Sequence, residues 1–143
     1  MTPDILKGLK QTTGAKMKLN IEQIEAKRKQ IREGNDLLRS TFFPFLGKVI
    51  LTSGVATSSF KEEVLTAVRE FSQFNNSNDP HQEHDFGMVE IGAKLADFGE
   101  KQDLEVKKFF FKIDYFDPSY EFGADPYTGP FKRVLTIMAA EEY

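Results

Sequence analysis

The segment from Asp79 to Asp85 holds the densest group of potential metal ligands in the sequence, with two histidines and three carboxylates among seven residues. Imidazole nitrogens and carboxylate oxygens both ligate divalent metal ions. The His81-x-x-His84 spacing puts both rings on one side only in a helix, and Pro80 disfavours a helix here. The local sequence therefore favours a polar turn with surface imidazoles, and a metal site is the alternative. His84 is the better functional candidate, because it stands at the entry to a predicted strand.

Carboxylates gather a second time after residue 113, at Asp114, Asp117, Glu121 and Asp125. A pair of carboxylates can perform acid–base chemistry or hold Mg²⁺ when its surroundings separate the two pKa values. Asp-Pro steps at residues 117 and 125 are typical of turns, and Asp114 could pair with Lys112 or Arg133 on a sheet face. A structural role is favoured, and catalysis by Asp114 and Asp117 is the alternative.

The two clusters together give one alternative metal site, which a small metal-dependent hydrolase or nuclease would use: His84, Asp85, Asp114 and Asp117. The sequence contains no G-x-S-x-G nucleophile elbow, no P-loop and no G-x-G-x-x-G motif. It contains no cysteine, which excludes a thiol nucleophile, a disulfide framework and cysteine-ligated zinc. The favoured interpretation is a protein without a catalytic site, and for it we predict no cofactor.

The elements that must position these residues follow from apolar spacing. A capping-box pattern at Asn20 and Gln23 precedes a stripe of isoleucine and leucine, which predicts a helix over residues 20–39. A second capping box at Ser59 and Glu62 predicts a helix that ends near residue 74. Its apolar face is expected to hold Phe60, Val64, Val68 and Phe71.

Strands are predicted over residues 47–53, 85–91, 107–116 and 132–140, and loops over residues 92–106 and 117–131. In the third strand, alternation places one set of side chains in the core and the other on a partly wet face. The core set is Phe109, Phe111, Ile113 and Tyr115, and the wet set is Phe110, Lys112, Asp114 and Phe116. The order α-β-α-β-β-β predicts an α+β fold of two layers, in which two main helices cover one face of a mostly antiparallel sheet of about four strands.

Length and composition favour one domain. We predict a flexible N-terminal arm over residues 1–16, which are polar and contain two glycines, and a single α+β domain over residues 17–143. Residues 1–40 carry nine basic and five acidic side chains, whereas residues 41–143 carry ten basic and seventeen acidic ones. The acidic body argues against direct binding of nucleic acid.

Hydropathy argues against a membrane protein. No apolar run approaches the roughly 18 residues that cross a bilayer, and residues 1–20 lack the apolar stretch of a secretory signal. We therefore expect a cytoplasmic protein without a membrane partner.

Several blocks of residues resemble the family of bacterial proteins of unknown function numbered 3768. The resemblance extends over residues ~35–143, and the blocks are Leu51–Val55, Asn78–Pro80, Glu83–Gly87, Phe111–Asp117, Arg133–Met138 and Glu141–Tyr143. It implies a small protein often carried by plasmids, phages and integrative elements, near antirestriction and maintenance genes. It implies no reaction, cofactor or catalytic residue.

These observations favour a protein-binding accessory protein of a mobile element, most concretely an inhibitor of a host defence complex of the restriction or CRISPR type. Its partner would be a host protein or a protein–nucleic-acid complex, and self-association into a homo-oligomer stays open. An acidic surface can occupy a basic channel by electrostatic complementarity. The residues we expect to bind the partner are Phe110, Phe116, Asp114, Asp117 and Glu121. The metal-dependent hydrolase or nuclease is the alternative.

Overall fold

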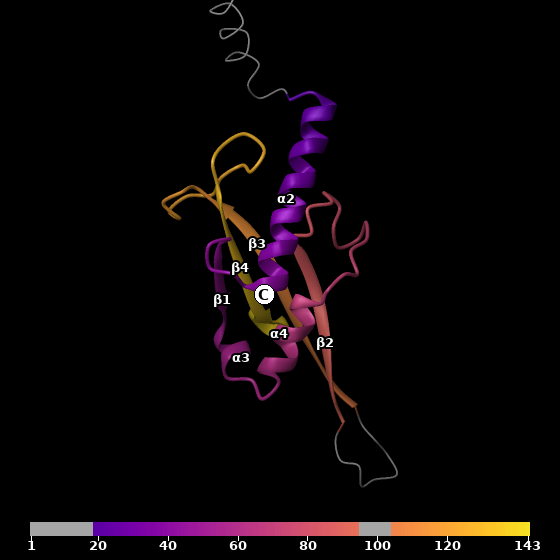
Figure 1. Ribbon diagram of the computed structural model, residues 1–143. Coiled ribbons are helices and arrows are strands. Elements are labelled where there is room, and N and C mark those ends of the chain that lie inside the picture. The colour runs from indigo at the N-terminus through magenta and orange to yellow at the C-terminus, as the bar shows by residue number, and fades with distance from the viewer. Residues whose placement is uncertain (1–18, 95–103) are drawn as a thin grey trace, which may run out of the picture.

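Apart from one additional short helix, the main helices and strands follow the predicted order in the computed structural model, which describes residues 19–94 and 104–143 (Figure 1). The predicted arm over residues 1–16 lies outside the described residues. In chain order the elements are α2 (Ile21–Thr41), β1 (Lys48–Leu51), α3 (Ser53–Ala56), α4 (Lys61–Arg69), β2 (Phe86–Lys94), β3 (Leu104–Phe116), β4 (Lys132–Ala139) and the 3₁₀ turn η1 (Ala140–Glu142). No helix among the described residues has the length and apolar character needed to cross a membrane.

The strands form one sheet in the order β1-β4-β3-β2. Strands β2, β3 and β4 form an antiparallel meander, in which Gly87 lies opposite Phe111 and Phe111 lies opposite Ile137. Strand β1 runs parallel to β4 at the other side of the sheet, with Leu51 opposite Ile137. The predicted α+β class and the mostly antiparallel sheet are confirmed.

The core lies between the sheet and the helices, which all cover the same face in Figure 1. Phe109, Phe111 and Ile113 of β3 are buried in it, as their alternation predicted. Helix α4 contributes Val64 and Val68, both without exposed surface. Burial of aromatic and branched side chains from both layers is the main force that holds the two layers together.

Helix α2 begins at the predicted capping box. Asn20 Oδ1 accepts a hydrogen bond from Gln23 N, and the Gln23 side chain accepts one from Asn20 N. The helix continues to Thr41 and ends where Phe42 adopts a left-handed conformation, with φ at 56°. Pro44 follows two residues later, so the chain cannot resume the helix. The apolar stripe is shorter than predicted, because Ile21 is 79% exposed.

Helix α4 differs from the prediction at both ends. The capping box of Ser59 and Glu62 does not form, and Ser58 Oγ instead accepts a hydrogen bond from the backbone N–H of Phe60. The helix ends at Arg69 rather than near residue 74. Phe71 and Phe74 leave it because both rings pack edge-on against Phe111, with centroids 5.1 and 6.3 Å away.

The predicted loop over residues 92–106 is wrong at its two ends, since β2 continues to Lys94 and β3 begins at Leu104. Its middle, residues 95–103, lies outside the described residues. The short helix α3 was not predicted. A residue near the C-terminus supplies hydrogen-bond acceptors at the start of α3. The Glu142 carboxylate accepts hydrogen bonds from Gly54 N and from the Thr52 hydroxyl.

Candidate functional site

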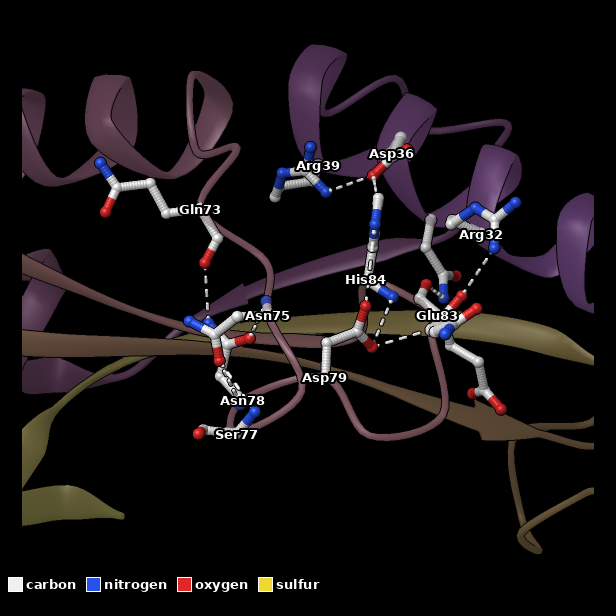
Figure 2. Close-up of polar contacts among 12 residues, drawn as sticks. Arg32, Asp36, Arg39, Gln73, Asn75, Ser77, Asn78, Asp79, Glu83 and His84 are labelled. Carbon is white, nitrogen blue, oxygen red and sulfur yellow. Dashed lines mark hydrogen bonds and ion pairs between the residues drawn. The ribbon is translucent and has the colours of Figure 1, made fainter.

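His84 lies between two carboxylates, where the loop before β2 meets helix α2 (Figure 2). Its Nδ1 atom is 2.8 Å from Asp36 Oδ1, and its Nε2 atom is 3.7 Å from Asp79 Oδ2. One face of the ring stacks on Phe74, with 3.9 Å between the centroids. The imidazole therefore connects the loop to the helix and has both nitrogens directed at carboxylates.

The loop that presents His84 is organised by the buried side chain of Asp79. Asp79 Oδ1 accepts hydrogen bonds from the backbone N–H groups of Glu83 at 2.9 Å and His84 at 3.1 Å. Between them the backbone is tightly turned, and both Gln82 and His84 have a φ of 57°. Residues other than glycine adopt this left-handed conformation at a cost, and the bonds to Asp79 offset it. Asp79 thus acts as the anchor of a polar turn.

Two arginines of α2 complete this cluster. Arg39 donates a hydrogen bond to Asp36 Oδ1 at 2.8 Å, the same oxygen that faces His84. Arg32 donates one to the carbonyl oxygen of Gln82 at 3.1 Å. A hollow of about 390 Å³ opens over the cluster and is lined by Arg32, Phe74, Asn75, Asn76, Asp79, Gln82 and His84.

Glu83 forms a second, more deeply buried network behind the first. Its side chain is 7% exposed, and its carboxylate accepts hydrogen bonds from the hydroxyls of Tyr115 at 2.7 Å and Tyr127 at 2.9 Å. Burial and the bond to Glu83 raise the pKa of Tyr127 to about 12. The pKa of Tyr115 is raised further, again first by burial. Both tyrosines are therefore fixed hydrogen-bond donors at physiological pH.

Asn35 of α2 joins the helix to this network and is completely buried. Its amide nitrogen donates to the carbonyl oxygen of Glu83 at 2.9 Å and to the hydroxyl oxygen of Tyr115 at 2.8 Å. Its amide oxygen accepts from Arg133 Nε at 2.7 Å. One side chain thus connects α2, the loop, β3 and β4, which makes the polar region a structural junction.

Asp85 is a carboxyl group of this region whose pKa lies well above its ordinary value. Burial, followed by the nearby charges of Glu83 and Asp79, raises the pKa of its carboxyl to about 6. A carboxyl that titrates near neutral pH is a common property of catalytic acids and bases. Asp85 has no nucleophile or hydrogen-bonding histidine beside it among the side-chain contacts of the described residues, so its altered pKa follows from its position in an acidic, desolvated turn.

The four residues of the predicted metal site are not brought together. His84 and Asp85 lie on the helix-covered side of the sheet, whereas Asp114 points to the opposite side and forms an ion pair of 2.8 Å with Lys112. Asp117 lies beyond the end of β3. Within residues 19–94 and 104–143, no three histidine or carboxylate side chains are grouped closely enough to hold a metal ion. The predicted pairing of Asp114 with Lys112 is observed, whereas Arg133 binds Asn35 instead.

Asp117 organises the turn that follows β3. Its carboxylate accepts hydrogen bonds from the Ser119 hydroxyl at 2.7 Å and from the backbone N–H of Glu121 at 3.0 Å. These bonds, the one from Ser119 first, lower the pKa of Asp117. The turn residue expected from the Asp-Pro step is therefore in place, and Glu121 contributes its backbone while its side chain is exposed.

The side of the sheet away from the helices, called the open face below, has no helix over it among the described residues (Figure 1). Alternation along the paired strands determines which side chains point to it. Among the side chains that the structure describes, they are Lys48 and Ile50 of β1, Phe86, Met88 and Glu90 of β2, Val106, Lys108, Phe110, Lys112, Asp114 and Phe116 of β3, and Lys132, Val134, Thr136 and Met138 of β4. Val134 and Met138 are nevertheless buried.

An aromatic cluster of Phe86, Phe110 and Tyr143 lies on the open face. The rings of Phe86 and Phe110 stack with centroids 5.4 Å apart, and Tyr143 lies 5.2 Å from Phe110. Tyr143 is 73% exposed and the neighbouring Met88 is 38% exposed. Phe116 is half-buried at the end of β3, where its backbone bridges to Gly123. Of the predicted partner-binding residues, Phe110, Asp114 and Phe116 share this face.

Sequence reasoning missed three residues of the polar networks, Asn35, Asp36 and Tyr127. It named Asp79, Glu83 and Arg133 but did not predict the partners that the structure gives them. A buried Asn on an otherwise apolar helix stripe was the one available signal, since Asn35 falls one turn after Ile31 and one turn before Leu38. Tyr115 was assigned to the core face correctly, but its hydroxyl partner could not be inferred from alternation.

Comparison with known proteins gives one positive result. No curated protein and no solved structure matches the chain. A family model matches the part of the chain from the end of β1 to η1. The matched part includes the His84 loop and most of the open face, and α2 lies before it. That model, described as protein of unknown function (DUF3768), matches residues 51–142, which is more than half of the sequence, and the chain therefore belongs to this family.

Proposed function

We propose that this protein is a non-catalytic accessory protein of a mobile genetic element and that it acts by binding another protein through the open face of its sheet. The observation that carries the proposal is the aromatic cluster on that face. Phe86, Phe110 and Tyr143 lie next to Met88 with no helix of the described residues above them. Met88 and Tyr143 are exposed, whereas Phe86 and Phe110 are half-buried beside them. Apolar side chains gathered at the surface are typical of protein interfaces, where aromatic residues supply much of the binding energy.

The charges around the cluster favour a particular kind of partner surface. Among its described side chains, the open face has four lysines, Lys48, Lys108, Lys112 and Lys132, and two carboxylates, Glu90 and Asp114. The excess negative charge of the body therefore lies elsewhere, and the open face fits a partner surface with an apolar centre and an acidic border. This differs from the acidic contact surface expected from the net charge.

Nucleic acid is the less favoured ligand of this face. Stacking platforms for bases need rings that present a free face to solvent. Here the rings of Phe86 and Phe110 stack on each other, and the ring of Tyr143 packs against both. Glu90 and Asp114 also interrupt the row of lysines, which weakens contact with phosphates.

The partner we propose is a protein subunit of a host defence complex, such as a restriction or CRISPR effector. The genetic setting implied by the family resemblance supports this choice. Inhibition by occupying a subunit surface needs no reaction, which agrees with the structural roles found for Asp79, Asp117 and Asn35.

Matched variants test the open face in the native host. Met88→Glu adds a charge beside the aromatic cluster at an exposed position. Leu37→Glu adds the same charge to an exposed apolar position on α2, the other layer, and serves as control. Tagged wild type and both variants are used for affinity capture with mass spectrometry, and the captured protein is then purified and titrated against each.

The expected result is one defence subunit retained by the wild type and by Leu37→Glu, with affinity for Met88→Glu at least tenfold weaker, which corresponds to about 1.4 kcal/mol. The wild type should also protect an incoming plasmid or phage, and Met88→Glu should not. The proposal fails if Met88→Glu binds as well as the wild type, if no defence protein is captured, or if nuclease treatment abolishes capture.

A further inference from the structure

We infer that the outer edge of β2 pairs with the same edge of a second copy of this chain, so that two four-stranded sheets continue as one. The inference concerns the strand edge rather than the open face, and it does not rest on the proposed function. If it holds, the two open faces become parts of one wider surface.

Within the part of the chain that the structure describes, β2 forms the long unpaired edge of the sheet. Strand β2 stands last in the order β1-β4-β3-β2 and spans Phe86–Lys94, whereas β1 at the other side has only four residues. No backbone or side-chain hydrogen bond from elsewhere in residues 19–94 and 104–143 reaches Phe86 to Gly92 apart from the ladder with β3. Proteins usually protect such edges with proline, a bulge or several charges. From Phe86 to Gly92 this edge has one charged residue, Glu90, and no proline.

One hydrogen bond at the start of β2 determines to which side the backbone groups of each β2 residue point. Ile113 N donates to the carbonyl oxygen of Asp85 at 2.8 Å, so these two residues form a hydrogen-bonded pair. Bonded and non-bonded pairs alternate along an antiparallel ladder. Gly87, Val89 and Ile91 therefore bond to β3. The backbone groups of Phe86, Met88, Glu90 and Gly92 point to the free edge.

A two-fold axis beside Val89 satisfies all of these outward groups. It places Val89 opposite Val89 of the second copy as a non-bonded pair. Met88 then bonds to Glu90 of the second copy, and Phe86 bonds to Gly92 of the second copy. The glycine provides room for the Phe86 ring, because a Cβ atom at Gly92 would meet nothing within 4 Å.

The two neighbouring registers, with the axis at Glu90 or at Met88, are less favourable. An axis at Glu90 places two carboxylates directly opposite each other, which is destabilising. An axis at Met88 places Phe86 opposite Glu90 of the second copy and loses the contact with Gly92. A second copy is thus the occupant for which this edge is complementary in size and hydrogen bonding.

Proline and alanine at one position test the edge. The N–H of Glu90 points outward, so Glu90→Pro removes an intermolecular donor and leaves the β3 ladder intact. Glu90→Ala keeps the donor and removes the charge. Sedimentation equilibrium of the full chain over a wide concentration range should give twice the 16.3 kDa chain mass for the wild type and for Glu90→Ala. It should give the single mass for Glu90→Pro, with an unchanged circular dichroism spectrum.

Cysteine variants test the register without relying on proline. The chain has no cysteine, so a single substitution creates one possible intermolecular disulfide. Val89→Cys places two sulfurs across a non-bonded pair, whose spacing suits a disulfide. Ile91→Cys is the control, because position 91 faces position 87 of the second copy. Oxidation should crosslink Val89→Cys and leave Ile91→Cys uncrosslinked.

The inference is overturned if the wild type remains monomeric at every concentration. It is also overturned if Glu90→Pro is folded and still dimeric, or if Ile91→Cys crosslinks as well as Val89→Cys. A monomeric wild type would leave the proposed binding through the open face intact, so the two failures are distinguishable.

Discussion

At the scale of single residues, Phe111 is the largest completely buried side chain of the described residues. It has no exposed surface, and its ring contacts those of Phe71 and Phe74 edge-on. A Cβ atom added at Gly87, on the neighbouring strand, would come within 2.3 Å of the Phe111 ring. The ring thus fills the space between β2 and the helical layer.

We therefore expect Phe111→Ala to lower the free energy of unfolding by roughly 3–5 kcal/mol, measured by urea denaturation. Phe110→Ala is the matched control one residue away, on the open face, and should cost clearly less because that ring is only half-buried. Equal losses for the two variants would mean that the open face is covered, which would count against it as a binding surface.

Asp85 makes stability depend on pH in the direction opposite to that of a typical paired carboxylate. Its folded pKa of about 6 lies above the ordinary value of 3.8, so the folded state holds the proton more tightly. The stability that this proton contributes is present below pH 4 and is lost as the pH rises through 6. By linkage the penalty at neutral pH reaches up to about 3 kcal/mol.

Asp85→Asn should remove this penalty. We expect the variant to exceed the wild type in free energy of unfolding by roughly 1–3 kcal/mol at pH 7.5 and to match it at pH 4. Urea denaturation at both pH values measures the difference, in which the titration of groups that do not interact with Asp85 cancels. A variant that is less stable than the wild type at pH 7.5 would show that the ionised carboxylate has a favourable partner.

The residues of the core could be predicted from the sequence, and those of the polar networks could not. Alternation places Phe109, Phe111 and Ile113 on one face because it is a local property of a strand. The contact between Asn35 and Glu83 joins residues 48 positions apart, and its geometry depends on how helix and loop dock. No local pattern carries that information. For the same reason the position of the His84 loop relative to Asp114, in the alternative metal site, could not be predicted until the docking of loop and sheet was known.

At the scale of elements, α2 is attached to the rest of the molecule by polar contacts as well as by its apolar side chains. Asn35 connects it to the loop and to β3 and β4, and Asp36 connects it to His84. The buried side chains Ile31 and Leu38 lie one turn away on either side. The polar contacts are specific for one orientation, so they determine where along the sheet the helix lies.

Asn35→Ala should therefore destabilise the protein by about 2–3 kcal/mol, because Arg133 Nε and the Glu83 carbonyl oxygen lose a buried partner. Amide hydrogen exchange should rise first in α2 and in residues 79–85. Leu37→Ala, on the exposed side of the same helix, controls for helix propensity and should change little. Unaltered exchange in α2 after Asn35→Ala would show that apolar contacts alone hold the helix.

The end of α4 shows that apolar periodicity in the sequence does not determine where a helix ends. Phe71 continues the apolar spacing of Phe60, Val64 and Val68, and the sequence therefore predicted a helix past it. The chain leaves the helix after Arg69 because Phe71 and Phe74 both reach Phe111 from an extended segment. Tertiary contacts of two large rings outweigh the modest helical preference of one more turn.

At the scale of the whole molecule, the two sides of the sheet differ in what completes them. The helices cover one side, and the C-terminal residues partly cover the other. Tyr143 contacts Phe86 and Phe110, while Glu142 bonds to Ala139 N, Gly54 N and the Thr52 hydroxyl. The last four residues thus shield apolar surface and secure α3 at the same time.

Two variants separate these roles. A chain that ends at Ala139 should lose both, so we expect a melting temperature several degrees lower and stronger fluorescence of a dye that binds apolar surface. Tyr143→Ala keeps the bonds of Glu142 and removes only the ring, and it should increase dye binding with little change in melting temperature. Both readouts are taken on the same samples, with circular dichroism to confirm that the sheet persists. If neither variant binds more dye than the wild type, the aromatic cluster is already as accessible with Tyr143 as without it, and the C-terminal residues do not shield the open face.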